Sequence, residues 1–351
     1  MTGVTTIMLF FGVLAAFLAA SVRGHRGLDA VCILSLLVLF KLSPATALFL
    51  ITSTVVIPVT LKAEWAKDNR AFILTTFTTL LIAGLVVSRL NELILWIGVS
   101  YFVLRHLHVV VEWWLRRIEA PSISDYFRYQ FFLPVLVAGP IHRFPKFKRE
   151  MSRRRVTTDS VLLGLERLLL GLASIVIVAN WALRRALEMV QASMASEPVF
   201  FQHWVSGCFE WLQIFFSFGG YSAVAIGLAK IAGITIEENF NAPWRASDLV
   251  DFWRRWHITL SSWVRDYLHG PVSAHFRWPA TGALVAMIAM GLWHDLSWYY
   301  LGWGLWQGLG IVLTQSLIAD HHQAPAWLLR LSVPVWLTLT KPVVSLFTGL
   351  L

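Results

Sequence analysis

Charged residues are scarce in this sequence. Lys, Arg, Asp and Glu together make up 14% of the 351 residues, whereas apolar residues make up 57%. Soluble domains carry about 25% charged and about 45–50% apolar residues, so this composition predicts an integral membrane protein. The 18 Trp and 23 Phe residues also exclude an intrinsically disordered chain.

Cysteine and the common catalytic motifs are nearly or wholly missing. Cys32 and Cys208 are the two cysteines, and both lie in apolar runs, which excludes a disulfide framework and a zinc ribbon. The sequence contains no Gly-rich phosphate loop, HExxH motif or nucleophile elbow. Two candidate histidines, His257 and His294, have no evident third ligand beside them. We therefore predict no metal site.

The net charge of +9 does not indicate a nucleic-acid partner, because so apolar a chain has little soluble surface. Basic residues in membrane proteins more often mark cytoplasmic loops. A span needs about 20 apolar residues, and roughly nine to eleven segments approach that length. We predict an all-α polytopic protein of the inner (cytoplasmic) membrane, with the lipid bilayer as its first partner.

The N-terminal basic clusters predict an orientation. The segment from Val4 to Val22 is expected to be a retained helix, because it lacks the features of a cleaved signal peptide. Hairpin helices at 28–41 and 44–61, and helices at 71–88 and 93–115, are expected to follow. An N-terminus outside the cell places all three clusters in the cytoplasm: Arg23 with Arg26, Lys62 with Lys67 and Arg70, and Arg116 with Arg117.

Residues 142–155, HRFPKFKREMSRRR, hold seven of the 29 Lys and Arg residues. This segment is predicted to be cytoplasmic. It is either a docking surface, for anionic headgroups, coenzyme phosphates or an acyl carrier protein, or a solvated segment that only sets the topology. The preceding apolar stretch, 131–141, is too short to span and contains two prolines. It predicts an irregular re-entrant segment shielded from lipid. Further on, Gly219, Ala223 and Gly227 predict a close helix contact.

A polar island lies between Glu237 and Pro271, in the sequence EENFNAPWRASDLVDFWRRWHITLSSWVRDYLHGP. Ser247 is a candidate helix cap, and Asp251 and Arg255 are spaced to pair on one helix face. On a continuous helix His257 would share a face with Trp253 and Ser261. This helix either lies in the membrane interface or brings polar groups to a cavity.

His294 follows the almost wholly apolar run 280–293. Burial there would keep its imidazole neutral, which suits a general base. The alternative is a histidine that reaches the interface among Trp residues.

Four stretches together resemble the membrane-bound O-acyltransferases, in particular the bacterial branch with the alginate O-acetylation and teichoic-acid D-alanylation subunits. They are FFLPVLVAGPIHRF, GGYSAVAIGLAKIAG, ENFNAPWRASDLVDFWRRWHITLSSWVRDYL and GLWHDLSWYYLGWGLWQG. They occur in the family's order, and the region from the first to the last, 131–308, is about half of the chain. RRWHITLSSWVRDYL and GLWH are the most specific pieces.

The resemblance implies a helical membrane enzyme around a central tunnel, with His294 as the catalytic residue and His257 as the second catalytic position. It implies no covalently bound cofactor and a cytoplasmic thioester donor, acyl-CoA (acetyl-CoA first) or an acyl carrier protein. The acceptor would be a hydroxyl of a cell-surface polysaccharide or exopolysaccharide. An extracytoplasmic acetyltransferase or polysaccharide-synthesis complex would be the partner.

The chain departs from the family at several points, and these leave the acceptor and the partner open. Ala223 stands where one form of the motif has Asp, Asp295 replaces Gly after the histidine, and HGPV replaces a Pro-Leu-Gly-Gly run. The sequence after His294 is shorter than in alginate-type members. We expect one domain over 1–351, with N-terminal helices (1–120), a motif-bearing core (121–310) and a short helical end (311–351).

The expected chemistry is direct transfer from thioester to hydroxyl, with His294 as general base. Donor or acceptor binding is assigned to residues of the island and the GLWH motif: Asp251, Trp253, Arg254, Arg255, Ser261, Trp293 and Asp295. Three alternatives stay open: an acyl relay through Ser222, Ser261 or Ser262, transfer of D-alanine or another acyl group to a teichoic-acid-like polymer, lipid or metabolite, and a non-catalytic conduit or scaffold.

Overall fold

The structure is a computed structural model that describes residues 24–91, 94–319 and 325–349. The helix expected at Val4–Val22 lies outside these residues. The described chain is helical, and its one β-type contact is an isolated bridge between Phe240 and Trp256. The predicted all-α class is therefore confirmed.

Four helical segments of the described chain are long and apolar enough to cross a bilayer. They are Pro44–Lys62, Arg70–Leu90, Thr158–Ser193 and Val199–Ile231, and shorter apolar helices lie at Pro279–His294 and Ala326–Thr338. These segments support a membrane-spanning chain, while the count of nine to eleven spans stays a prediction.

The chain divides into two compact units, each described here by itself. Unit 1 comprises Met1–Leu169 and Ala223–Glu237, and unit 2 comprises Leu170–Ser222 and Glu238–Leu351. Two of the three boundaries fall inside long helices, α9 (Thr158–Ala173) and α11 (Val199–Ile231), and the third follows Glu237. Each of these helices therefore contributes residues to both units.

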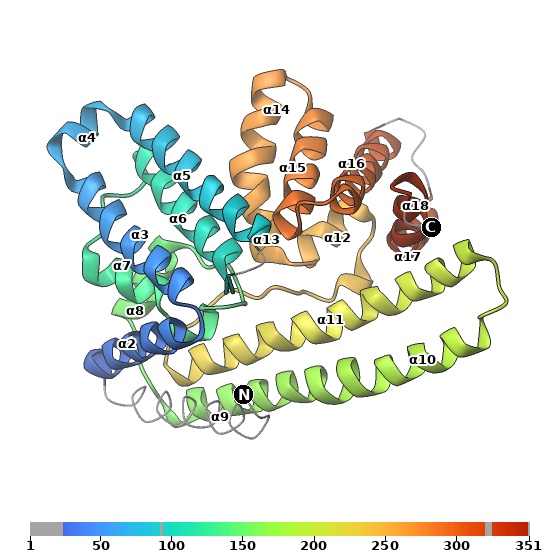
Figure 1. Ribbon diagram of the computed structural model, residues 1–351, viewed down its shortest axis with the longest axis horizontal. Coiled ribbons are helices and arrows are strands. Elements are labelled where there is room, and N and C mark those ends of the chain that lie inside the picture. The colour runs from blue at the N-terminus through green and yellow to red at the C-terminus, as the bar shows by residue number, and fades with distance from the viewer. Residues whose placement is uncertain (1–23, 92–93, 320–324, 350–351) are drawn as a thin grey trace. The chain divides into compact units, whose positions relative to one another are not determined.

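Unit 1 begins with the predicted hairpin of α2 (Gly24–Leu42) and α3 (Pro44–Lys62). Ser43 caps α3, because its hydroxyl accepts a hydrogen bond from the Thr46 amide at 3.3 Å. α3 packs against α2, α6 and α7, and α5 packs against α6 (Figure 1). The remaining unit 1 helices are α4 (Glu64–Asp68), α5 (Arg70–Leu90), α6 (Val99–Trp114), α7 (Ile123–Gln130) and α8 (Phe144–Ser152).

The helix expected over 93–115 begins only at Val99 in the structure. α6 is not one of the long apolar spans; it carries a fully buried arginine, Arg105, and two buried histidines, His106 and His108. Apolar composition therefore did not predict these buried polar side chains. His106, His108 and Arg105 each have a hydrogen-bond partner inside unit 1.

The segment 131–141 is irregular and buried, as predicted. It contains one short 3-10 turn, η1 (Leu133–Val135), and Phe131 and Phe132 are wholly inaccessible to solvent. Pro134 and Pro140 interrupt regular hydrogen bonding, so the backbone must be shielded by protein. Its placement as a re-entrant segment stays a prediction.

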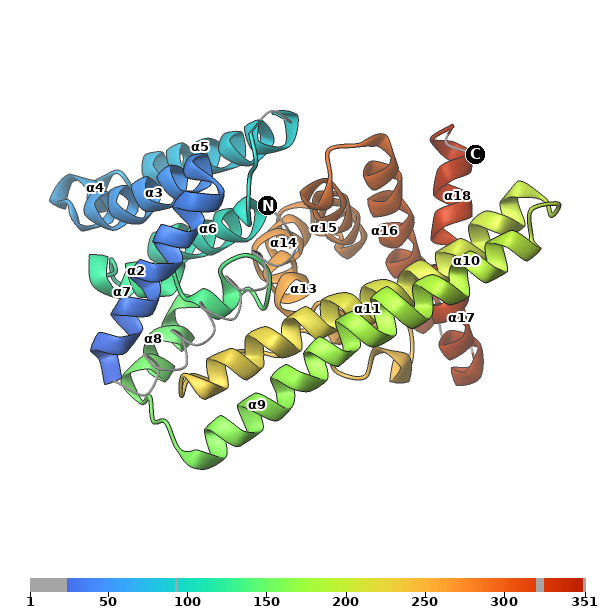
Figure 2. The same cartoon turned by 60° about the horizontal axis from the view of Figure 1, so that its bottom comes forward.

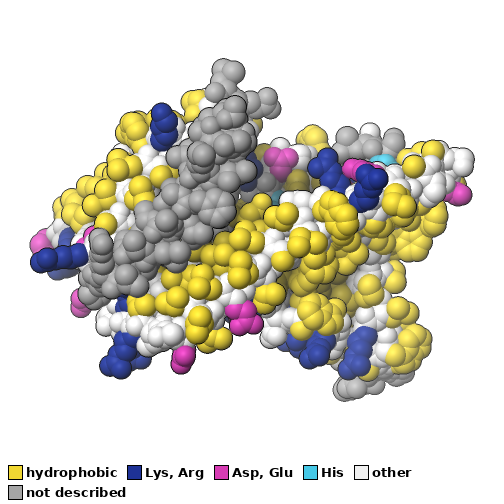
Figure 3. All heavy atoms as spheres, turned by 90° about the horizontal axis from the view of Figure 1, so that it is seen from below, with side chains coloured by type: hydrophobic (Ala, Val, Ile, Leu, Met, Phe, Trp, Pro, Cys, Tyr) yellow, Lys and Arg dark blue, Asp and Glu magenta, His cyan; other side chains and the backbone are white. Residues whose placement is uncertain are grey.

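α9, the π-helical segment η2 (Ser174–Leu183) and α10 (Arg184–Ser193) follow one another along the chain over 36 residues, and α11 has 33 residues (Figures 1 and 2). Both are about 50 Å long at 1.5 Å per residue, longer than one perpendicular crossing. Hydrophobic side chains are frequent on the face that Figure 3 shows. Leu163, Leu170, Ile177 and Trp181 of the 158–193 segment are exposed.

Glycines bring these two helices into backbone contact. A Cβ on Gly227 would lie 2.6 Å from the Gly164 carbonyl in unit 1, and one on Gly220 would lie 2.8 Å from the Gly171 carbonyl in unit 2. The predicted close helix contact is confirmed at Gly227. Two helical turns earlier, the contact is made by Gly220 and not by the predicted Gly219.

Unit 2 consists mainly of short helices. η3 (Pro243–Arg245), α12 (Leu249–Arg255), α13 (Ile258–Val264), the π-helical turn η4 (Arg265–His269) and α14 (Gly270–Phe276) follow the end of α11. α15 (Pro279–His294) packs along α16 (Trp298–Ala319), and α12 contacts α16 and α17 (Ala326–Thr338). α18 (Thr340–Phe347) packs against α16 and α17 (Figure 1).

Candidate active site

The polar island forms two helices instead of one. Asp248, not Ser247, caps α12, because its carboxylate accepts the Asp251 amide at 2.8 Å. The predicted pair of Asp251 and Arg255 is confirmed at 2.9 Å. The helix then breaks at Trp256 and His257, and His257 adopts left-handed dihedral angles (φ 43°, ψ 52°). A continuous helix with Trp253, His257 and Ser261 on one face was therefore a wrong prediction.

Asn239 holds this break in place. Its carbonyl accepts the Ile258 amide at 2.9 Å, and its side-chain oxygen accepts the Thr259 hydroxyl at 2.6 Å. Its amide group donates to the Ser222 hydroxyl at 3.0 Å. A non-glycine residue in the left-handed region costs about 1–2 kcal/mol, so this buried clamp positions His257. Asn239 was not predicted from the sequence, because nothing in the local pattern distinguishes it from Asn241 or indicates that it is buried.

His257 is enclosed by aromatic rings. Its ring centroid lies 4.6 Å from that of Phe218 and 6.2 Å from that of Trp293, and the side chain is only 5% exposed. Its Nε2 atom is buried and makes no hydrogen bond to any residue that the structure describes. Burial, and then the charge of nearby His294, lowers the pKa of His257 well below its usual range. The imidazole is therefore neutral, with unused hydrogen-bonding capacity.

His294 is the last residue of α15, as its position after the apolar run predicted. Its ring lies 4.8 Å from Trp293, stacks on Tyr300 at 5.8 Å and meets the edge of Trp303 at 5.9 Å. It is half-buried rather than buried, so the expectation of a fully desolvated His294 was wrong. The helix end, where the chain turns at Asp295, leaves one side of the ring accessible.

The structure brings both histidine rings close to one indole, that of Trp293. They come from segments 37 residues apart, and close packing of α15 on α16 fixes the second of them. A Cβ on Gly291 would lie 2.2 Å from the Tyr300 carbonyl, so only glycine permits this approach. Asp295 donates its amide to the Gly291 carbonyl at 3.1 Å and ends the helix.

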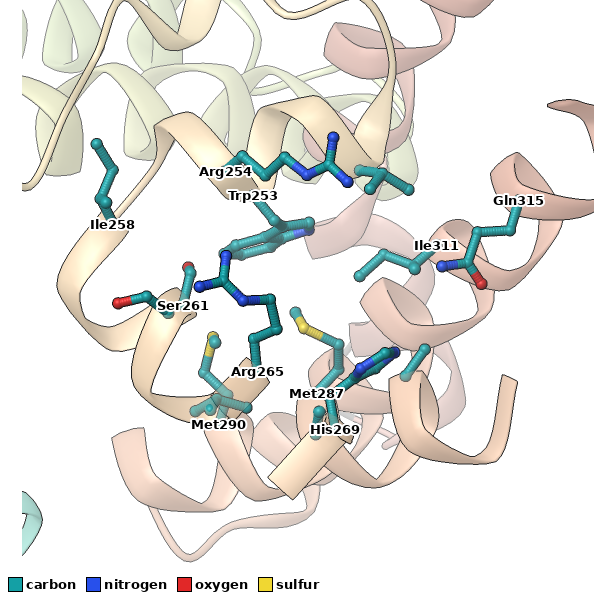
Figure 4. A pocket seen from close by; sticks show the side chains of 15 residues that line it. Trp253, Arg254, Ile258, Ser261, Arg265, His269, Met287, Met290, Ile311 and Gln315 are labelled. Carbon is teal, nitrogen blue, oxygen red and sulfur yellow. The ribbon is translucent and has the colours of Figure 1, made fainter. Parts of the chain in front are cut away.

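A cavity of about 190 Å³ lies beside this cluster in unit 2 (Figure 4). Trp253 connects the two, because its ring is 5.8 Å from Trp303, which in turn contacts His294. The cavity is smaller than the ~300–1,000 Å³ sites that enclose a whole small molecule, so it suits one part of a larger ligand. Its lining comes from α12, α13, η4, α15 and α16, and the polar members are Arg254, Ser261, Ser262, Arg265, His269 and Gln315.

Positive charge dominates this cavity. Arg254 lines it and makes no ion pair within the described chain, and Arg265 extends toward Trp253 (Figure 4) while it also pairs with Asp266 at 3.1 Å. Burial and the adjacent Arg265 lower the pKa of His269, so this imidazole serves as a neutral donor or acceptor. No carboxylate lines the cavity, which favours an anionic ligand.

The predicted binding residues thus separate into two groups. Trp253, Arg254 and Ser261 line the cavity, and Trp293 contacts both histidines. Asp251, Arg255 and Asp295 do not line it; Asp251 and Arg255 pair with each other, and Asp295 ends α15. Sequence reasoning missed Arg265 and His269 as lining residues, although 261, 265 and 269 recur every four positions.

Among the residues that the structure describes, no group of three or more His, Cys, Asp or Glu side chains could hold a metal ion.

The fold and the site define a polytopic helical membrane protein with a histidine pair beside a cationic cavity. The membrane-bound O-acyltransferase family model matches residues 72–337, so the chain belongs to this family. The family assignment made from the four sequence stretches is confirmed.

Curated relatives are similar to parts of this chain. The probable alginate O-acetylase AlgI of Azotobacter vinelandii is 29% identical over 268 residues, which are 74% of this chain and 51% of the relative. The teichoic acid D-alanyltransferase of Streptococcus thermophilus is 27% identical over 71% of this chain and 65% of its own length. The peptidoglycan O-acetyltransferase of Helicobacter pylori is 32% identical over 53% and 36%. The chain spans about half the length of the alginate relatives.

Proposed function

We propose that this protein is an O-acyltransferase that moves an acyl group, acetyl in the first instance, from a cytoplasmic thioester to a polysaccharide hydroxyl. The observation that carries the proposal is the contact of both His257 and His294 with one indole, next to a cavity whose lining includes two arginines and no carboxylate. The family membership and the printed names of the relatives support the same reaction class.

His294 acts as the general base in this mechanism. It takes the proton of the acceptor hydroxyl while the oxygen attacks the thioester carbonyl carbon. A carbon–oxygen bond forms, the tetrahedral intermediate collapses, and the carbon–sulfur bond breaks. The thiolate leaves and recovers the proton from His294, so the products are an ester and a thiol. Positioned base catalysis of this kind contributes about 10²–10⁴-fold.

His257 stabilises the oxygen that becomes negative during the attack. Its buried Nε2 has no partner in the described chain, and a neutral imidazole can present an N–H there. The left-handed backbone and the Asn239 clamp fix its direction in advance. A donor held in this way requires no reorganisation when charge develops.

The donor's phosphates bind in the cationic cavity. Arg254 and Arg265 supply charge, and His269 and Ser262 supply further hydrogen bonds. This arrangement serves coenzyme A and the phosphopantetheine arm of a carrier protein alike. A carrier would dock on residues 142–155, where Arg149, Arg153 and Arg155 are exposed, whereas Lys146 and Lys148 pair with Glu237 and Asp125 inside unit 1.

The acceptor is a hydroxyl of a cell-surface or exopolysaccharide, delivered directly or through an extracytoplasmic acetyltransferase or polysaccharide-synthesis complex. The protein resides in the inner membrane with its N-terminus outside. A second candidate is D-alanyl transfer to a teichoic-acid-like polymer, because a D-alanyltransferase matches 71% of this chain. A lipid or small-metabolite acceptor is a third form of the same reaction.

A covalent relay through serine has less support. Ser261 donates its hydroxyl to the Trp256 carbonyl at 3.0 Å, and Ser262 donates to the Thr259 carbonyl at 3.1 Å. Ser222 accepts a hydrogen bond from Asn239. All three hydroxyls therefore have structural partners, and none of these contacts is to His257 or His294.

The proposal is tested by reconstitution of the full chain in liposomes with acetyl-labelled acetyl-CoA and candidate polymers. We expect release of free coenzyme A and, by mass spectrometry, label in ester linkage on a polymer. Parallel reactions with a carrier-bound acetyl thioester and with a D-alanyl carrier thioester separate the donors. A folded protein that cleaves none of these thioesters, yet lets a donor or glycan cross the bilayer, would establish the conduit instead.

A further inference from the structure

Unit 2 contains a second and larger cavity, of about 840 Å³. It lies between α11, the η3 turn, one face of α12 and α17. We call it the aromatic groove. Its lining consists of Cys208, Trp211, Leu212, Phe215, Pro243, Trp244, Arg245, Ala246, Phe252, Trp256, Arg330, Val333, Pro334, Leu337 and Thr338.

The aromatic groove is separate from the cationic cavity of about 190 Å³. The two cavities share no lining residue, because α12 presents Val250, Trp253 and Arg254 to one and Phe252 to the other. Trp256, which precedes His257, also lines the groove. The thioester donor is assigned to the other cavity, so the proposed reaction gives the aromatic groove no ligand.

The walls of the groove are aromatic and aliphatic. Trp211 meets Trp256 at 5.1 Å, and Phe215 meets Trp244 at 5.6 Å, both edge to face. The few polar groups are already used: the Trp211 indole donates to the Leu337 carbonyl, and the Thr338 hydroxyl donates to the Pro334 carbonyl. Such walls match a hydrocarbon chain and offer little to a sugar polymer.

Two arginines supply the only charges among the lining residues. Arg245 and Arg330 are both exposed, and neither makes an ion pair with another residue in the described ranges. Trp244, 72% exposed, adjoins Arg245. An exposed Trp beside an arginine is the arrangement found where membrane proteins meet lipid headgroups.

We propose that the aromatic groove binds an anionic phospholipid of the bilayer, with an acyl chain along the groove and the phosphate on Arg245 and Arg330. Its volume lies within the ~300–1,000 Å³ range of ligand sites, and basic pockets between membrane helices bind anionic headgroups. α11, which forms one wall, is long and apolar enough to span the membrane. In a membrane-spanning α11, this wall of the groove is next to bilayer lipids, which are present at high local concentration.

The binding is measured on the full-length protein by native mass spectrometry. The protein is extracted from nanodiscs that contain equal amounts of phosphatidylglycerol and phosphatidylcholine. We expect retained phosphatidylglycerol, and about tenfold less of it in the Arg245→Ala/Arg330→Ala double variant, because charge-assisted hydrogen bonds to phosphate are lost. The control, Arg184→Ala/Arg185→Ala on α10, removes two exposed arginines elsewhere and should retain lipid as the wild type does.

A second measurement locates the acyl chain. Phosphatidylglycerol with a diazirine in its acyl chain should label peptides of α11 and α17, and Leu212→Trp, which fills the groove, should reduce that labelling. Equal retention of phosphatidylcholine, or labelling that Leu212→Trp does not change, overturns the proposal. Retention of no lipid, with copies of the chain paired through this face, also overturns it. These readouts need no acyl-transfer activity.

Discussion

Two buried histidines, His106 of unit 1 and His257 of unit 2, differ in their surroundings. In unit 1, His106 is wholly buried, its Nδ1 lies 2.5 Å from the Tyr126 hydroxyl, and its Nε2 lies 2.9 Å from the Ser53 hydroxyl. In unit 2, His257 is equally enclosed, yet its Nε2 has no partner among the described residues and its neighbours are aromatic rings. Both ring nitrogens of His106 have hydrogen-bond partners in the protein, whereas Nε2 of His257 has none among the described residues.

This difference shows that burial alone does not identify a functional histidine. A buried polar group normally finds its hydrogen bonds within the protein, and His106 follows that rule. His257 departs from it next to a half-buried second histidine and a cationic cavity. The predictions below test whether chemistry belongs to unit 2 and structural stabilisation to the unit 1 network.

The largest expected effect is that of His294→Ala. Loss of the general base should lower kcat/KM for acetyl-CoA by about 10²–10⁴-fold, measured as coenzyme A release per folded molecule. His275→Ala is the matched control, because His275 is an exposed histidine of α14 in the same unit. A His294→Ala protein with more than about a tenth of wild-type turnover would remove His294 from the mechanism.

Arg254→Ala should raise KM for acetyl-CoA about 10- to 150-fold, which corresponds to loss of a charge-assisted hydrogen bond worth about 1.5–3 kcal/mol. We expect kcat to change little, because the phosphate contact is remote from the thioester. Initial rates over a range of donor concentrations separate the two parameters. The exposed Arg185→Ala variant serves as control, and an unchanged KM in Arg254→Ala would place the donor elsewhere.

Tyr126→Phe should act on stability. The substitution removes the hydroxyl that bonds His106 Nδ1. Because Gln130 Nε2 lies 3.1 Å from the same nitrogen, the expected loss is that of one net hydrogen bond, about 0.5–1.5 kcal/mol. Thermal unfolding in detergent should shift to lower temperature, with coenzyme A release per folded molecule retained. Loss of turnover at unchanged stability would mean that the unit 1 network takes part in the chemistry.

The smallest effect concerns pH. Because burial lowers the pKa of His257 in the folded state, the unfolded chain binds more protons below about pH 6.5, and stability falls as pH decreases. Between pH 7.5 and 5.5 this site contributes a loss of at most about 1.4 kcal/mol. His257→Asn tolerates the left-handed backbone, so its pH dependence of unfolding should be flatter than that of the wild type. Equal slopes would contradict a neutral, buried His257.

Local sequence spacing predicted the parts of the site that depend on one helix. Asp251 and Arg255 pair because four residues make one turn. α15 ends at His294 because the apolar run ends there. The apolar composition likewise predicted the long helices α3, α5 and α11.

The remaining features depend on contacts between distant segments. The break at His257 is held by Asn239 and, through it, Ser222. The separation of Arg254 from Arg255 depends on how α12 packs, and the π-helical turn η4 places Arg265 and His269 on the cavity. Helical periodicity contains no information about contacts between distant segments. The sequence therefore identified candidate residues, but not which of them line the same cavity.

Photo-crosslinking tests most directly the central claim that the donor binds in unit 2. An acyl-CoA analogue with a diazirine near the thioester would be activated in the reconstituted protein, and the labelled peptides would be identified by mass spectrometry. We predict labelling of cavity residues such as Ile258, Met287 and Met290, competed by acetyl-CoA and weakened in Arg254→Ala. Labelling confined to unit 1 peptides, around His106 and Tyr126, would contradict this assignment.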